Sequence, residues 1–189
     1  MLPPDLRAWL DAIPEDARDR ELEALFGIGL ASDESPGRDL IGYHAAGVRP
    51  ILHMIDEVPI TEDDVFVDIG AGLGKAVLLT ALLTGARSRG IEIQATLVAR
   101  AIEAAARLGA NASFVGGDAR DEETELDDGT VFFLYLPFTG EALQRVLDRL
   151  KRVADDHPIV VCTLGLDLPK QRWLRRRDVD DFWLSIYDA

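Results

Sequence analysis

The sequence predicts an α/β fold built on a doubly wound, mostly parallel sheet. The first observation is the strand-like run 65–69, which a glycine-rich turn joins to the apolar helical run 76–83. The second is that strand patterns then alternate with helical ones along the rest of the chain. Strands separated by helices favour parallel pairing, because each return to the same edge of the sheet needs a crossover. The later predicted elements are a strand at 86–93, a helix at 94–108, a strand from 112, a strand from 130, a helix at 140–153 and a strand at 157–164.

The third observation is composition. The chain has 189 residues, of which 48% are hydrophobic and 29% charged, which is typical of a single globular domain with a sizeable core. Residues 4–26 show short helical patterns, and a loop rich in Gly, Ser, Asp and Pro follows them. We therefore expect a helical N-terminal cap and loop over residues 1–39 and an α/β domain over residues 40–189, as one structural unit.

The charge balance limits the partners that the chain could bind. Twenty basic and 34 acidic side chains give a formal charge of −14, with a pI near 4.5. This balance argues against nucleic acid and acidic membrane surfaces, whereas a basic protein or peptide would be attracted. The single cysteine, Cys162, excludes an intrachain disulfide and a cysteine zinc site, and we expect no metal. No signal-like N-terminus and no membrane-spanning apolar run are present in the sequence, so we expect a cytoplasmic protein.

The glycine-rich turn has the sequence D68-I-G-A-G-L-G74. Its glycines allow a tight turn and close approach of a ligand, and the next helix offers unpaired N–H groups. The third glycine of the NAD fingerprint would fall at position 75, which is Lys75, and a Walker loop would need Ser or Thr where Ala76 stands. Asp68 at the strand end would repel a pyrophosphate, but it suits a ligand that carries an ammonium and a sulfonium group.

This turn resembles motif I of the class I S-adenosylmethionine-dependent methyltransferases. The resemblance implies a Rossmann-like fold, with the helical cap in front and a short C-terminal hairpin that adds an antiparallel edge strand. It also implies S-adenosylmethionine as cofactor. Asp68 and the turn residues would then hold its amino-acid end; these residues are Gly70, Ala71, Gly72 and Gly74.

Two further strand ends carry acids in the order that this resemblance implies. Glu92 follows Gly74 by 92 − 74 = 18 residues, about the offset expected for a carboxylate that accepts from ribose hydroxyls. Ile93 would press against the adenine face. At the third strand end, the resemblance places Asp118 at the exocyclic amine of adenine, with the backbone of Ala119 completing the adenine edge.

The exit of the fourth strand reads Y135-L-P-F138. Many amino-group methyltransferases carry Asn/Asp-Pro-Pro-Tyr/Phe here, so the Pro-Phe pair is kept while Leu136 replaces the polar residue. This pattern resembles a loosely related set of bacterial methyltransferases and, more remotely, the Dot1-type histone lysine methyltransferases, over about residues 40–165. Tyr135 either orients the nucleophile through its hydroxyl, as a catalytic residue, or packs on the cofactor. Tyr43, Pro137 and Phe138 are candidate substrate residues.

We therefore expect a methyltransferase that acts on a protein side chain or a small molecule. The loss of the polar residue at Leu136 leaves open a cofactor-binding protein without catalysis. An NAD(P)-dependent oxidoreductase is a further alternative, against which Lys75 speaks. Two basic clusters are predicted to face solvent: the polar side of helix 140–153, which includes Arg149, and the run 175–177, which could instead anchor an acidic partner.

Overall fold

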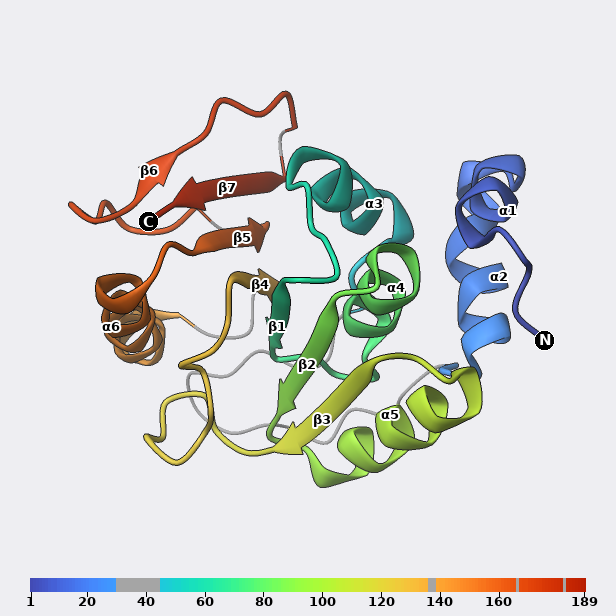
Figure 1. The fold of residues 1–189 in the computed structure, drawn as a ribbon, viewed down its shortest axis with the longest axis horizontal. Coiled ribbons are helices and arrows are strands. Elements are labelled where there is room, and N and C mark those ends of the chain that lie inside the picture. The colour runs from blue at the N-terminus through green and yellow to red at the C-terminus, as the bar shows by residue number, and fades with distance from the viewer. Residues whose placement is uncertain (30–44, 136–138, 166, 182) are drawn as a thin grey trace.

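The computed structural model describes residues 1–29, 45–135, 139–165, 167–181 and 183–189. Its centre is a seven-stranded sheet with the strand order β3-β2-β1-β4-β5-β7-β6 (Figure 1). The strands in chain order are β1 (Val65–Ile69), β2 (Arg87–Glu92), β3 (Ala112–Gly116), β4 (Val131–Tyr135), β5 (Val160–Leu164), β6 (Arg175–Arg176) and β7 (Leu184–Asp188).

Strands β1 to β5 pair in parallel, whereas β7 runs antiparallel to both β5 and β6. This pairing confirms the predicted doubly wound, mostly parallel sheet with a C-terminal hairpin at its edge. The strand order reverses between β1 and β4, and ligands of such sheets bind outside the carboxyl ends of the strands at that point. We therefore expect a ligand site at the exits of β1, β2, β3 and β4.

Helices cover both faces of the sheet (Figure 1). Three helices lie on one face: α3 (Val48–Glu57), α4 (Lys75–Thr84) and α5 (Ala95–Leu108). Helix α6 (Gly140–Asp156) lies on the other. The strands supply side chains to the two faces in alternation: Phe66 stacks on Phe133 under α3–α5, at 6.3 Å between ring centroids, whereas Phe132 is buried under α6.

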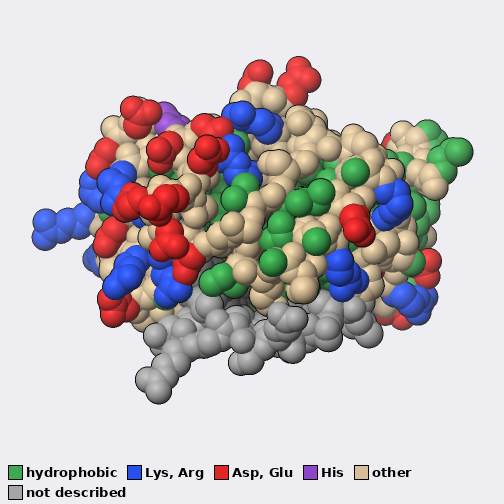
Figure 2. All heavy atoms as spheres, turned by 90° about the horizontal axis from the view of Figure 1, so that it is seen from below, with side chains coloured by type: hydrophobic (Ala, Val, Ile, Leu, Met, Phe, Trp, Pro, Cys, Tyr) green, Lys and Arg blue, Asp and Glu red, His purple; other side chains and the backbone are tan. Residues whose placement is uncertain are grey.

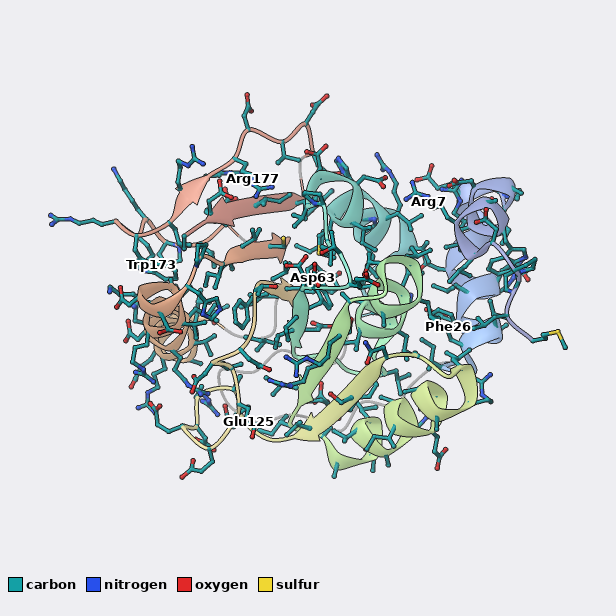
Figure 3. The ribbon with its side chains drawn as sticks, viewed as in Figure 1. Arg7, Phe26, Asp63, Glu125, Trp173 and Arg177 are labelled. Atoms are coloured by element: carbon teal, nitrogen blue, oxygen red, sulfur yellow. The ribbon has the colours of Figure 1, made fainter. Side chains whose placement is uncertain are left out.

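Helices α1 (Leu6–Ala12) and α2 (Glu15–Phe26) lie outside α3 and α4, at one end of the molecule (Figures 1 and 3). Leu22 and Phe26 of α2 are fully buried and belong to the same apolar cluster as α4. Asp5 precedes α1 as its N-cap, and its carboxylate accepts from the Ala8 N–H at 2.9 Å. These helices therefore extend the core of the α/β sandwich.

Ion pairs of the buried Lys75 side chain join α2 to the start of α4. The Lys75 side chain is 5% exposed, and its Nζ lies 2.8 Å from Asp19 Oδ1 and 2.6 Å from Glu23 Oε1. Asp19 also accepts from the N–H of Val48, the first residue of α3, at 3.0 Å. The Asp19 carboxylate therefore binds the first residue of α3 and the first residue of α4.

The basic run 175–177 forms ion pairs within the chain. Arg175 and Arg177 pair with Asp188 at 2.9 and 2.6 Å, and Arg176 pairs with Asp167 at 3.1 Å (Figure 3 labels Arg177). Asp167 and Asp188, which lie next to this C-terminal hairpin or in it, therefore balance the positive charge of the run.

The described residues form neither a membrane-spanning helix nor a group of metal ligands. Across the described ranges, no helix combines the length and apolarity needed to cross a bilayer, and no three His, Cys, Asp or Glu side chains are grouped to hold a metal ion. Cys162 is buried in β5, and this burial raises the pKa of its thiol to about 12, so the thiol is protonated at neutral pH.

Replacing Gly90 should test the packing of β2 against β3. A Cβ at Gly90 would lie 2.5 Å from the Phe114 ring and 2.8 Å from Ala71 Cβ, both of which are buried. Gly90→Ala should lower the free energy of unfolding by about 2 kcal/mol, measured by urea denaturation. Gly29→Ala, where a Cβ meets nothing within 4 Å, is the matched control and should change stability by less than about 0.5 kcal/mol. Equal effects of the two substitutions would contradict this account.

Candidate functional site

The glycine-rich turn connects β1 to α4 through residues in the left-handed region. Gly70, Gly72 and Gly74 have φ values of 87°, 55° and 81°. The N–H groups of Gly70 and Ala71 donate to the Ile91 carbonyl at 2.9 and 3.0 Å, which folds the turn back onto β2. At Gly74 a side chain is excluded twice, by its φ and by the Phe114 ring, which occupies the place of a Cβ. The turn is therefore fixed in shape where it opens α4.

Glu92, the last residue of β2, joins this turn to the next one. Its Oε2 accepts from the Gly72 N–H and its Oε1 from the Gln94 N–H, each at 2.9 Å, and the side chain is buried. Each carboxylate oxygen has two lone pairs, so both keep acceptor capacity. Glu92 is thus oriented by the backbone and can still accept from hydroxyl groups of a ligand.

Asp68, the fourth residue of β1, is buried beside this carboxylate. Burial, and secondarily the negative charge of Glu92, raise the pKa of Asp68 to about 8, and no hydrogen-bond donor in the described part of the chain offsets them. A cation placed next to Asp68 would lower that pKa and favour the ionised form. The two strand ends therefore form a site suited to positive charge and hydroxyl donors.

The exit of β3 lies next to that of β2, since the Gly117 N–H donates to the Glu92 carbonyl at 3.0 Å. Ile93 is 46% exposed there, so an apolar side chain is available to a planar ligand. The Asp118 carboxylate accepts from the Arg120 N–H at 2.9 Å and from the Arg120 guanidinium, which holds the pKa of Asp118 below its usual range. Ala119 is buried.

Arg149 corrects the prediction that the polar side of helix 140–153 faces solvent. Its side chain is 5% exposed, and it donates to the carbonyls of Ala119, Asp121 and Thr124 at 2.8, 2.6 and 2.6 Å. The helical spacing held the signal: position 149 is three residues after Val146 and four before Val153, both of which are buried. Sequence reasoning missed it because arginine is rarely buried.

A hollow of about 220 Å³ lies at the exits of β4 and β5. Its lining comes from the start of α3, from both strand exits and from the approach to β7: Gly47, Arg49, Pro50, Tyr135, Leu164, Gly165, Asp181 and Trp183. Among these, only Tyr135 was predicted as a site residue. The others come from segments far apart in the sequence and carry no motif that could have identified them.

Asp181 gives the hollow a fixed negative charge. Its carboxylate accepts from the Trp183 and Leu184 N–H groups at 2.7 and 3.0 Å and lies 3.0 Å from His53 Nδ1. Burial opposes ionisation, but these partners hold the pKa of Asp181 below its usual range. The aromatic rings of Tyr135 and Trp183 line the same hollow, which therefore combines apolar surface with a carboxylate.

The structure thus places most of the predicted site residues at one edge of the sheet. The turn and Glu92 lie at neighbouring strand exits, joined by hydrogen bonds, with Asp118 next in order and Tyr135 across the switch point on β4. The candidate substrate residues Tyr43, Pro137 and Phe138 lie outside the described residues. The assigned roles remain predictions, while the shared edge is a structural observation.

Comparison with known proteins agrees with this arrangement. A family model described as histone methylation protein DOT1 matches residues 45–128, from just before α3 to the loop before β4. An RNA methyltransferase from Salinibacter ruber, solved with S-adenosylhomocysteine, has a similar structure: TM-score 0.54 and 27% identity over 77% of this chain and 92% of that one. The chain has the fold of a class I S-adenosylmethionine-dependent methyltransferase. The resemblance expected from the sequence is confirmed, with Dot1 as a remote relative.

Two further structures share this methyltransferase fold at lower identity. A S-adenosylmethionine-dependent methyltransferase from Aquifex aeolicus has a TM-score of 0.55 and 18% identity, over 74% of this chain and 88% of that one. The PH0226 protein from Pyrococcus horikoshii has a TM-score of 0.57 and 15% identity, over 75% and 87%. A search of curated proteins finds no match to the chain.

Replacing Asp68 should stabilise the ligand-free protein at high pH. Since the folded pKa of about 8 exceeds the ordinary aspartate value of 3.8, the carboxyl contributes stability at low pH, and that contribution is lost as pH rises toward 8. Asp68→Asn cannot ionise, so its free energy of unfolding should exceed that of the wild type by at least about 1 kcal/mol at pH 8, with little difference at pH 4. Urea denaturation across this range measures the effect, and a constant difference would contradict it.

Proposed function

We propose that this protein binds S-adenosylmethionine at the exits of β1 to β3 and transfers its methyl group to an acceptor in the hollow beside Tyr135. The observation that carries the proposal is Asp68, a buried carboxyl with no donor among the described residues, next to the glycine-rich turn and Glu92. The methionine ammonium would supply the missing positive charge, and the ribose hydroxyls would donate to Glu92.

The same geometry speaks against a dinucleotide. A pyrophosphate at this turn would meet the negative charge of Glu92, and the Asp68 carboxyl would stay protonated, so the phosphate charge would need a compensating cation. Lys75 is the cation nearest in sequence, but its Nζ is buried in ion pairs with Asp19 and Glu23 of α2. The turn therefore offers backbone N–H groups and acids, which fits a cationic amino acid better than a diphosphate.

Bound S-adenosylmethionine supplies a methyl group on a cationic sulfur, which an acceptor lone pair takes in line while the bonding electrons return to sulfur. The chain contributes mainly position and a dry environment, which can suffice for such a displacement. We assign to Tyr135, at the β4 exit, the task of orienting the acceptor nucleophile through its hydroxyl. Asp181 would attract a positively charged acceptor or one that carries hydrogen-bond donors.

For the acceptor we propose a protein side chain or a small molecule. The Salinibacter ruber relative is an RNA methyltransferase, but this chain carries a net charge of −14 and an anionic wall at Asp181. Both would repel a polyanion. The hollow of about 220 Å³ has room for a side chain or for the reactive end of a larger molecule.

Calorimetric titration of the purified protein with S-adenosylmethionine, S-adenosylhomocysteine and NAD tests the cofactor. We expect the first two to bind and NAD not to bind. Near pH 7 the binding of S-adenosylhomocysteine should also release a proton from Asp68, because the ligand ammonium lowers its raised pKa; the binding heat should then depend on the buffer. Binding of NAD alone, or of none of the three ligands, would overturn the proposal.

A turnover assay separates catalysis from binding alone. Tritiated methyl transfer should be measured to basic proteins, small amines and RNA, with wild type and Tyr135→Phe in parallel. Transfer to one of the first two classes, reduced in the variant, would support the proposal. Intact cofactor binding without transfer to any acceptor would instead favour a non-catalytic binding protein, and transfer to RNA would overturn the proposed acceptor class.

Glu92→Gln should weaken S-adenosylmethionine binding by about tenfold or more. The amide loses the charge that strengthens bonds from ribose hydroxyls, and its NH₂ group opposes one of the N–H donors of Gly72 and Gln94. Glu103→Gln, on the exposed side of α5, is the matched control and should leave the affinity unchanged. Unaltered affinity in a folded Glu92→Gln variant would remove Glu92 from the site.

A further inference from the structure

The connection between β3 and β4 lacks a helix. Parallel strands are usually joined by a helical crossover, in which backbone groups pair within the segment. Here residues 117–130, all of which are described, form turns instead. Ala119, Thr124 and Leu126 in this loop are nevertheless buried. Carbonyl groups of a buried loop need donors from elsewhere.

Arg149 of α6 supplies those donors. Its Nη1 bonds to the carbonyls of Ala119 and Asp121, and its Nη2 bonds to that of Thr124. The loop also folds on itself, since the Thr124 hydroxyl and the Asp121 N–H both donate to the Asp118 carbonyl, at 2.7 and 3.0 Å. One guanidinium thus fixes the path of the chain from residue 119 to residue 124.

Burying this guanidinium costs free energy, because its only ion-pair partner among the described residues is the exposed carboxylate of Glu122, at 3.9 Å. Its Nε is buried without a hydrogen bond in the described structure. Other basic residues of α6 pair on the surface, Arg145 with Glu141 and Lys151 with Asp155, at the end of the molecule where charged side chains gather in Figure 2. Arg149 differs from these exposed residues because it is buried against the loop. Its three bonds to loop carbonyls indicate that the loop is held in a defined position on α6.

The loop carries the two residues assigned to adenine. A peptide unit is planar and trans, so anchoring the Asp118 carbonyl directs the Ala119 N–H to the opposite side. An adenine edge offers an amine donor and a ring-nitrogen acceptor, which match the Asp118 carboxylate and the Ala119 N–H. A hypoxanthine edge offers the reverse pattern: a carbonyl acceptor and a ring N–H donor.

We propose that Arg149 is a positioning residue that sets the selectivity of the cofactor site for adenine, by holding the Ala119–Thr124 loop against α6. The proposal rests on the proposed function, since it assumes that the ligand carries a nucleoside. Arg149 itself need not touch the ligand. Its effect passes through the carbonyls of Ala119 and Thr124 to the Asp118–Ala119 peptide.

The test compares S-adenosylhomocysteine with S-inosylhomocysteine by calorimetric titration. Wild type should prefer the adenine ligand by at least about tenfold, since a site built to hydrogen-bond one edge rejects the other. Arg149→Met and Thr124→Val should reduce this preference to less than about threefold, mainly through weaker binding of the adenine ligand. Arg149→Lys should keep part of the preference, because its ammonium can still donate to carbonyls. Lys151→Met, whose ammonium pairs with Asp155 on the exposed side of the same helix, is the matched control and should behave as wild type.

The outcomes separate the two proposals. If wild type binds neither ligand, the proposed function fails and this inference fails with it. If wild type binds the adenine ligand and both variants keep its preference, only the role of Arg149 is overturned, because a merely structural residue would weaken both ligands equally. Should Arg149→Met not fold, Arg149→Lys decides: its ammonium cannot reproduce all three guanidinium bonds to the loop carbonyls, so a preference equal to that of the wild type would overturn the role of Arg149.

Discussion

The carboxylate of Glu92 holds the candidate site together. It accepts from the backbone of Gly72 on one side and of Gln94 on the other, so the turn after β1 and the turn after β2 cannot move independently. Charge-assisted bonds of this kind offset the cost of burying a carboxylate. The same charge helps to keep Asp68 protonated. One side chain therefore sets both the shape of the site and its affinity for a cation.

The cations around the site already have partners within the protein. Lys75 pairs with α2, Arg120 with Asp118, and Arg149 with carbonyls of the loop after β3. The acids Asp68 and Glu92 keep no cationic partner among the described residues. In a chain with a net charge of −14, this arrangement leaves a negative potential at the strand exits, which favours a ligand that carries an ammonium and a sulfonium.

The sequence predicted the parts of the site whose causes are local. Alternate glycines allow a tight turn, and acids at the ends of neighbouring parallel strands lie at the same edge of the sheet. The turn and Glu92 could therefore be predicted from the sequence. Arg149 could not, and its predicted exposure was wrong. Its burial depends on a loop 25 to 30 residues earlier in the chain that has no helix of its own to satisfy its carbonyls.

The sequence alone determined the fold class, the turn that opens α4 and the order in which acids occupy the strand ends, because periodicity, glycine spacing and strand polarity are properties of neighbouring residues. Only the tertiary structure decided that no described residue donates to Asp68, that Lys75 pairs with α2 and that Tyr135 shares a hollow with Asp181 and Trp183. These facts depend on burial and on segments distant in the chain. Burial and such long-range contacts exist only once the sheet and its helices have assembled.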